Sequence, residues 1–262
     1  MSITITLTPD FGTRDGFVGA MKGRILELCA TATVVDISHD IPPQDIRAGA
    51  WCLARATPCY PAGTIHVAVV DPGVGSARQA LLIQANRQWY IGPDNGLFGE
   101  VLVRYPTTAR YRLHPHTPWW QAHPSFDGLA LFSPAAACLA RGEALARLAE
   151  PIDTVVTLVR PEVRATDKGL VGEILLFDRF GNAITNLGGA ALAGLGELVR
   201  IVCRGKEFRR VAHYAEAGAQ QAAAIVNSDG LLELSLYCQS AREALGLAEG
   251  DPVEVFRDQG AD

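Results

Sequence analysis

The segment VVDPGVGSAR, residues 69–78, combines two glycines, a proline, a carboxylate and a guanidinium in one predicted turn. Glycine-rich turns after a strand often bind phosphate, but this one lacks the lysine of a Walker A loop. Arg78 stands where a dinucleotide-binding turn needs its third glycine, and the next segment has the pattern of a strand rather than a helix. These features argue against a phosphate site. Two interpretations stay open: a structural turn in which Asp71 and Arg78 pair, or a site that needs both charges.

Polar side chains also follow the two strands predicted earlier in the chain. Asp10 and Asp15 come after the β-branched run ITITLT, and the polar segment DISHDIPPQD follows the second run. Ligand sites in open α/β sheets collect at the carboxyl ends of parallel strands. We therefore expect three polar loops to lie at one edge of the sheet.

The second half of the chain carries a different mixture of groups, in the segments FDRFGNAITN and IVNSDG. An aromatic ring can stack on a base, and carboxylates or amides can bind ribose hydroxyls, so the mixture suits a nucleoside. Each group taken singly is more typical of a turn or a cap. The residues concerned are Asp178, Phe180, Asn182, Asn227 and Ser228.

Two kinds of hydrophobic pattern divide the chain. Over residues 1–162, β-branched runs alternate with segments of helical spacing, which predicts an α/β domain with a mostly parallel sheet between helices. Over residues 169–262, short strands joined by turn residues, with one brief helix around SAREALGL, predict a small antiparallel, barrel-like β domain. Proline and charge cluster between the two, at the expected boundary.

Composition narrows the classes of partner. The 262 residues carry a net charge of −5 without a basic stripe, which argues against nucleic acid as a partner. No signal peptide and no long apolar stretch is visible, so no membrane segment is expected. Six scattered cysteines without a C-x-x-C pair are typical of reduced thiols, which favours a cytoplasmic location.

Seven motifs together resemble the SAM hydroxide adenosyltransferases, the S-adenosylmethionine (SAM) hydrolases related to fluorinase and chlorinase. They stand in that family's order along nearly the whole chain: TPDFGTRDGFVGAMKG, VVDISHDIPPQDIRAGA, PAGTIHVAVVDPGVGSAR, YIGPDNGLF, LFSPAAACLARG, DRFGNAITN and NSDGLLEL. The resemblance implies attack of water or hydroxide on ribose C5′ of SAM, which releases adenosine and L-methionine. SAM is then the substrate, and no cofactor or metal is implied. The resemblance also implies a homotrimer with active sites between the first domain of one subunit and the second domain of its neighbour.

Individual roles follow from the same resemblance. Asp71 and Arg78 match two of three residues that position the water, and Gly128 matches the small residue beside the nucleophile. The substrate-binding matches are Asp10 for the ribose, Asp15 and Asp178 for the methionine ammonium, Ser228 for its carboxylate, and Phe180, Asn182 and Tyr214 for adenine.

The sequence departs from the family at the third water-positioning residue, a histidine in a segment of the form F-H-G-R-D. Here the segment is SFDGLALF, with Asp127 in place of the histidine. Three interpretations stay open. Asp127 can itself hold or deprotonate the water, or His123 can take the place of the family's histidine. Alternatively, the protein binds SAM or adenosine with lost or altered activity. Halogenation is the least favoured reaction, because fixed negative charge at Asp71 repels a halide. Asp229 beside Ser228 also places an acid near the expected methionine carboxylate.

A zinc site is the alternative from another class. His114, His116, His123 and Asp127 lie within fourteen residues, but a lone H-x-H with a wide gap is a weak ligand pattern. We interpret the segment as a solvated loop and expect no metal.

Overall fold

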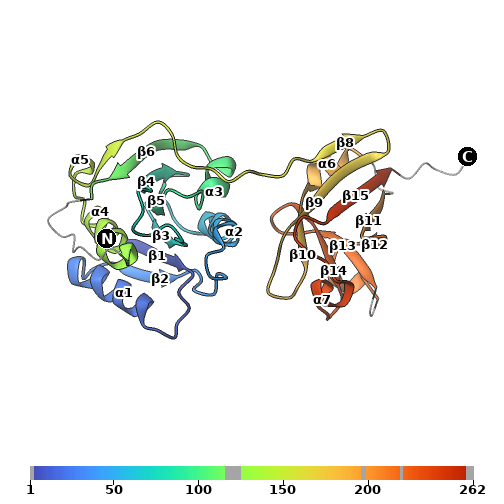
Figure 1. Cartoon of the computed structure of the whole chain (residues 1–262), viewed down its shortest axis with the longest axis horizontal. Coiled ribbons are helices and arrows are strands. Elements are labelled where there is room, and N and C mark those ends of the chain that lie inside the picture. The colour runs from blue at the N-terminus through green and yellow to red at the C-terminus, as the bar shows by residue number, and fades with distance from the viewer. Residues whose placement is uncertain (1–2, 116–124, 196–198, 219–220, 258–262) are drawn as a thin grey trace, which may run out of the picture. The chain divides into compact units, whose positions relative to one another are not determined.

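Two compact units make up the chain in the computed structural model, Met1–Leu158 and Val159–Asp262 (Figure 1). The structure describes residues 3–115, 125–195, 199–218 and 221–257. Within these ranges, no helix combines the length and the apolar character that crossing a membrane requires.

Seven strands form one sheet in the first unit: β1 (Thr4–Pro9), β2 (Thr33–Asp36), β3 (Ile65–Val69), β4 (Ala80–Ala85), β5 (Gln88–Pro93), β6 (Thr107–Leu113) and β7 (Ala149–Pro151). Their order across the sheet is β2-β1-β3-β5-β4-β6-β7. The pairs β2–β1, β1–β3 and β3–β5 are parallel, while β4 runs against both β5 and β6, and β7 runs against β6. Most strands therefore point the same way, and β1, β2 and β3 end at one edge.

Helices cover both faces of this sheet: α1 (Phe17–Leu28), α2 (Ile46–Ala56), η1 (Thr57–Cys59), α3 (Gly99–Arg104), the π-helix η2 (Gly128–Phe132), α4 (Ser133–Ala140) and α5 (Leu145–Leu148). Side chains alternate along β3, so Val67 packs with α1 and α4 in one core and Ala68 packs with α2 and α3 in another. The predicted α/β domain with a mostly parallel sheet between helices is confirmed.

The second unit contains eight strands: β8 (Arg164–Thr166), β9 (Gly169–Phe177), β10 (Ala183–Gly188), β11 (Val199–Cys203), β12 (Lys206–Arg210), β13 (Ala222–Val226), β14 (Leu231–Leu236) and β15 (Pro252–Arg257). Seven of them close into a barrel in the order β10-β14-β13-β12-β11-β15-β9, because β9 pairs back with β10. Strand β8 pairs with β9 outside the ring. Apolar side chains such as Phe208, Leu234 and Val255 fill the interior. The predicted small β-barrel is confirmed.

Two local features of the barrel differ from the sequence pattern. Strand β12 pairs with β13 in parallel, because the chain makes a crossover instead of a tight hairpin, and residues 211–218 of this crossover include the short helix η3 (Tyr214–Glu216). A small apolar cluster that includes Val211 and Ile225 holds this crossover on the barrel. The brief helix predicted near residue 241 is α7 (Ala241–Leu245), but a second one, α6 (Gly189–Ala193), was missed. The alanines and the leucine of this segment have high helix propensity, which is enough for one helical turn between the flanking glycines.

His66 is a buried titratable group on the same side of the sheet as Ala68. It lies in β3 without exposed surface, and its Nδ1 is 2.7 Å from the hydroxyl of Thr6. The rings of Tyr60 and Tyr90 pack beside it, with centroids 5.5 and 5.0 Å away. Burial lowers the pKa of His66 to about 4, against an opposing contribution of Gln88. The imidazole is therefore neutral in the folded protein at ordinary pH.

Stability should depend on pH through this residue. Between about pH 6.5 and pH 4 the unfolded chain protonates His66 and the folded protein does not, so the free energy of unfolding falls as pH falls. At 1.36 kcal/mol per unit of pKa shift, the loss attributable to His66 is about 3 kcal/mol. Urea denaturation at several pH values should show a shallower dependence for His66→Gln than for the wild type. Identical dependence in the two proteins contradicts a buried neutral imidazole.

Candidate active site

Arg78 joins two carboxylates that come from distant parts of the chain. Its Nε donates to Asp71 Oδ1 at 3.0 Å, and its Nη2 donates to both Asp71 Oδ2 and Asp127 Oδ2. The side chains are largely shielded, with exposed fractions of 4% for Asp71, 11% for Arg78 and 20% for Asp127. The structure therefore brings together the three residues that the sequence analysis singled out for catalysis.

The turn between β3 and β4 presents the first two of these groups. Asp71 follows β3 and Arg78 precedes β4, and Gly75 between them has a φ of +79°, which an L side chain rarely adopts. Asn95 Nδ2, beyond the end of β5, donates to the carbonyl oxygen of Val70 at 2.8 Å. This hydrogen bond fixes the start of the turn and hence the position of the Asp71 carboxylate.

A wide helical turn presents the third group. Asp127 stands directly before η2, and η2 continues into α4. Within the turn, Ser133 Oγ donates to the carbonyl oxygen of Gly128 at 2.7 Å. Pro134 has no N–H for the carbonyl of residue 130, so a regular α-helical ladder cannot run through this point. The π-helix accommodates that break and directs Asp127 toward Arg78.

The cluster carries one net negative charge, because one guanidinium faces two carboxylates. Burial by itself lowers the pKa of Arg78, but the hydrogen bonds and charges of Asp71 and Asp127 outweigh it and raise that pKa. Arg78 is therefore a fixed cation. A guanidinium that holds two carboxylates fixes the directions in which their remaining lone pairs accept hydrogen bonds, which is what orienting a water requires.

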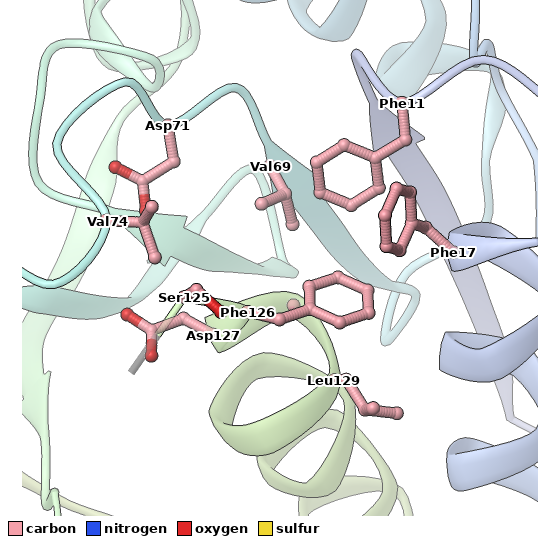
Figure 2. A pocket seen from close by; sticks show the side chains of 10 residues that line it. Phe11, Phe17, Val69, Asp71, Val74, Ser125, Phe126, Asp127 and Leu129 are labelled. Carbon is pink, nitrogen blue, oxygen red and sulfur yellow. The ribbon is translucent and has the colours of Figure 1, made fainter. Parts of the chain in front are cut away.

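A pocket of about 410 Å³ adjoins this cluster. Figure 2 shows Asp71 and Asp127 on one side of it and the rings of Phe11, Phe17 and Phe126 on the other. The three rings pack edge to face, with centroids 5.2 to 5.9 Å apart. An aromatic wall opposite a negative end suits an organic cation that is charged but poorly solvated. The sequence analysis gave none of these phenylalanines a role in a pocket, because an apolar residue in a loop or at the start of a helix has no local signal that separates a pocket wall from a core.

Gly128 is buried where the pocket wall meets the first core. A Cβ atom there would stand 2.9 Å from Phe126 Cε2 and 3.2 Å from Met21 Sδ. Real Cβ atoms essentially never approach a neighbour as closely as the first of these distances, so the Phe126 ring would have to move. The glycine thus permits the observed position of the aromatic wall.

Gly128→Ala is expected to lower the free energy of unfolding by about 1–3 kcal/mol, the usual result of overpacking. The matched control is Gly19→Ala on α1, where a Cβ meets nothing within 4 Å. Because alanine is the better helix former, that change should stabilise the protein by up to about 1 kcal/mol. Chemical denaturation of both variants measures the two effects. Equal results for the two glycines contradict the crowding at Gly128.

The predicted ribose and ammonium ligands of the first unit lie at the same sheet edge. Asp10 directly follows β1, and its Oδ2 accepts from the backbone N–H of Gln44 at 2.7 Å. Asp15 is exposed in the loop before α1. Among the described residues, those that form the pocket wall include neither carboxylate but do include their neighbours Phe11 and Phe17.

A second pocket, of about 510 Å³, lies in the barrel unit. It gathers four of the predicted substrate-binding residues, namely Asp178, Phe180, Asn182 and Tyr214. The rings of Phe180 and Tyr214 are 75% and 44% exposed, so both offer a face for stacking. The rest of the wall is formed by residues 236–240, from the end of β14 to the start of α7. The sequence analysis missed this segment, because only the barrel brings it beside the loop that follows β9.

Asp178 shapes the loop that carries these groups. Its Oδ1 accepts from the backbone N–H of Phe180 and of Asn182, each at 2.9 Å, and its Oδ2 accepts from Asn182 Nδ2 at 3.0 Å. The carboxylate therefore fixes the backbone at Phe180 and the side-chain amide of Asn182 in the pocket wall.

Asn227 and Ser228 occupy the turn between β13 and β14 and are absent from the described lining of this pocket. Asn227 Oδ1 accepts from the backbone N–H of Asp229 at 3.0 Å and of Leu231 at 3.2 Å, which closes the turn. Ser228 is exposed at its tip.

His116 and His123, the second of which is the alternative to Asp127, lie outside the described residues. Within the described ranges, no group of three or more histidine, cysteine, aspartate or glutamate side chains is placed to hold a metal ion.

Comparison with known proteins gives the family. A profile of the SAM hydroxide adenosyltransferase N-terminal domain matches residues 5–149, and a profile of the C-terminal domain of that family matches residues 172–254. The chain belongs to the SAM hydroxide adenosyltransferase family. The resemblance drawn from the seven sequence motifs is thereby confirmed.

Curated members of the SAM hydroxide adenosyltransferase family and their relatives align with almost the full length. The (R)-S-adenosyl-L-methionine hydrolase of Thermus thermophilus is 41% identical, over 94% of this chain and 97% of its own. The corresponding hydrolase of Methanocaldococcus jannaschii is 31% identical, with 96% and 95% covered. The fluorinase of Nocardia brasiliensis is more distant, at 28% identity with 96% of each chain covered.

Two solved structures are similar to this one over nearly the full chain. An uncharacterized conserved protein from Thermotoga maritima has a TM-score of 0.89 and 26% identity, with 97% of this chain and 100% of that chain covered. A conserved hypothetical protein from Thermus thermophilus has a TM-score of 0.80 and 36% identity, with 98% and 100% covered.

Proposed function

We propose that this protein hydrolyses S-adenosyl-L-methionine to adenosine and L-methionine. The observation that carries the proposal is the cluster of Asp71, Arg78 and Asp127 at one end of an aromatic pocket. Relatives named as hydrolases of the same compound support it, and they are closer in sequence than the fluorinases.

The reaction is an in-line displacement at ribose C5′. The new C5′–O bond forms as the C5′–S bond breaks, and the bonding electron pair passes to sulfur. Methionine leaves as a neutral thioether, so no acid has to protonate it. Asp71 and Arg78 orient the water, and Asp127, in place of the family's histidine, accepts its proton. Because the leaving group needs no acid, orientation of the water toward C5′ supplies most of the rate enhancement.

Substrate binding is divided between the two units. In the first unit, Asp10 binds the ribose, Asp15 binds the methionine ammonium, and Gly128 leaves room beside the nucleophile. In the barrel unit, Asp178 also binds the ammonium and Ser228 binds the methionine carboxylate. The adenine ligands are Phe180, Asn182 and Tyr214.

We further propose a homotrimer whose active sites form between the first unit of one subunit and the barrel unit of its neighbour. Its support is the division of the predicted site residues between two units, each with a pocket that holds part of the required set. A cytoplasmic location is supported by the six cysteines, all of which are free thiols.

The competing function is binding of SAM or adenosine without turnover, which the aspartate at position 127 favours. SAM-dependent halogenation is disfavoured, because the net negative charge of the cluster repels a halide while it tolerates neutral water and attracts the sulfonium.

Incubation of SAM with the purified protein distinguishes these functions. The R and S epimers at sulfur are tested separately, since the relatives' names specify R, and chloride and fluoride are added in parallel. Chromatography should show adenosine from the R epimer, with or without added halide. Tight binding of SAM without adenosine contradicts hydrolysis and leaves the binding function. A 5′-halogenated adenosine contradicts the proposed role of the cluster.

A further inference from the structure

We infer that Glu233 is a positioning residue, one that holds the adenine-binding ring and the methionine-end turn in place from behind. The inference rests on the proposed function, because it takes Tyr214 and the turn after Asn227 as parts of the substrate site. Nothing in the sequence motifs gave Glu233 a role.

Glu233 lies in the middle of β14 with only 4% of its surface exposed. Its neighbours Leu232 and Leu234 point into the barrel interior, and Glu233 points to the opposite face, where Val211 and Ala217 of the crossover lie. Burying a carboxylate costs free energy unless hydrogen bonds satisfy it. The hydrogen-bond partners of Glu233 must therefore offset the free-energy cost of burying its carboxylate.

Each carboxylate oxygen of Glu233 accepts from a different predicted substrate residue. Oε1 accepts from the hydroxyl of Tyr214, and Oε2 accepts from Asn227 Nδ2 at 3.2 Å. Tyr214 is in the wall of the barrel pocket together with Phe180. One side chain thus ties together a pocket wall and a turn that lie thirteen residues apart in sequence.

The Tyr214 ring depends on the hydrogen bond to Glu233, because it lacks the packing on all sides that holds a core side chain. It lies in the single turn of η3, which is too short to be stable by itself, and nearly half of its surface is exposed. The hydrogen bond to Glu233 fixes the end of the ring, so that its face stays available to a base at a lower entropic cost on binding.

The same argument holds for Asn227. Its Oδ1 closes the turn that carries Ser228, and its Nδ2 is held by Glu233, so the amide cannot rotate away from the turn. Loss of Glu233 would therefore loosen both the adenine end and the methionine end of the proposed site.

Calorimetric titration with adenosine tests the inference without any need for turnover. Glu233→Leu should weaken adenosine binding about tenfold, the equivalent of about 1.4 kcal/mol for one lost anchoring hydrogen bond. Glu233→Gln can still accept from Asn227 and donate to the oxygen of Tyr214, so it should restore affinity to within about threefold of the wild type. Ser235→Ala, two residues along the same face of β14 and equally buried, is the control that should bind normally.

A double-mutant cycle separates positioning from general damage. Tyr214→Phe keeps the ring but removes the hydroxyl, and Tyr214→Phe combined with Glu233→Leu should bind adenosine no worse than Glu233→Leu alone. In the hydrolysis assay, Glu233→Leu should raise KM for SAM and leave kcat nearly unchanged, because Glu233 is outside the described water-orienting cluster.

Normal adenosine affinity and normal KM in folded Glu233→Leu overturn the inference, as does additivity in the cycle. Failure of the wild type to bind adenosine overturns it as well. If the wild type binds adenosine in a Glu233-dependent way but releases none from SAM, the inference stands and the proposed hydrolysis fails.

Discussion

Replacement of Asp71 by asparagine is expected to lower kcat for adenosine formation by about a hundredfold or more, the usual size of a lost acid–base or charge-orienting group. Asparagine keeps the shape of the side chain but cannot accept both hydrogen bonds that Arg78 donates. Arg78 then loses its bidentate partner, and the water loses one of its fixed acceptors. Chromatographic measurement of adenosine at saturating SAM gives kcat directly.

Asp94→Asn is the matched control for this experiment. Asp94 follows β5 at the same sheet edge, and its Oδ1 accepts from the backbone N–H of Val156 at 2.7 Å, which an amide oxygen can also do. Burial raises the pKa of Asp94, partly offset by that hydrogen bond, so loss of its charge costs little. The control should turn over normally. Unchanged turnover in Asp71→Asn as well would show that the assigned mechanism is wrong.

Arg78→Met is expected to have the largest effect on stability, because it leaves two shielded carboxylates facing each other without their cation. Removal of one partner from a buried ion pair typically costs 3–5 kcal/mol, and partial exposure of Asp127 reduces the expected loss to about 2–4 kcal/mol. Urea denaturation at pH 7 measures this loss. Adenosine formation should be abolished in the same variant, since both carboxylates lose their orientation.

Arg112→Met provides the comparison for stability. Arg112 also pairs with a carboxylate, that of Glu150, but the two side chains are 49% and 43% exposed. Solvent screens such a pair, so its loss should cost less than about 1 kcal/mol. Similar losses of stability in the two variants contradict the view that Arg78 is a shielded centre of the cluster.

The local patterns of the sequence were sufficient for much of the fold. Alternation of β-branched runs with helical spacing predicted the α/β unit, and short strands with turn residues predicted the barrel. The pairing of Asp71 with Arg78 was also within reach, because the six residues between them include a proline and two glycines, which favour a compact turn. Family motifs in the right order then gave the family.

Other features depended on contacts between distant segments. The parallel pairing of β12 with β13 is set by the crossover that packs on the barrel, and no local pattern distinguishes such a crossover from a loop. The burial of Glu233 also depends on distant segments, because its two hydrogen-bond donors, Tyr214 and Asn227, lie in other turns. From the sequence alone, a charged residue in a strand is expected to be exposed, because its hydrogen-bond partners are not visible there.

The sequence by itself determined the two kinds of unit, the family and the residue types of the site. It showed that Asp127 stands at the position of the family's histidine, and it could not show what that aspartate contacts. Only the tertiary structure placed Asp127 on the guanidinium of Arg78, 49 residues away in sequence. The physical reason is that an ion pair depends on distance in space, and packing of the π-helix against the sheet, rather than any local preference, sets that distance.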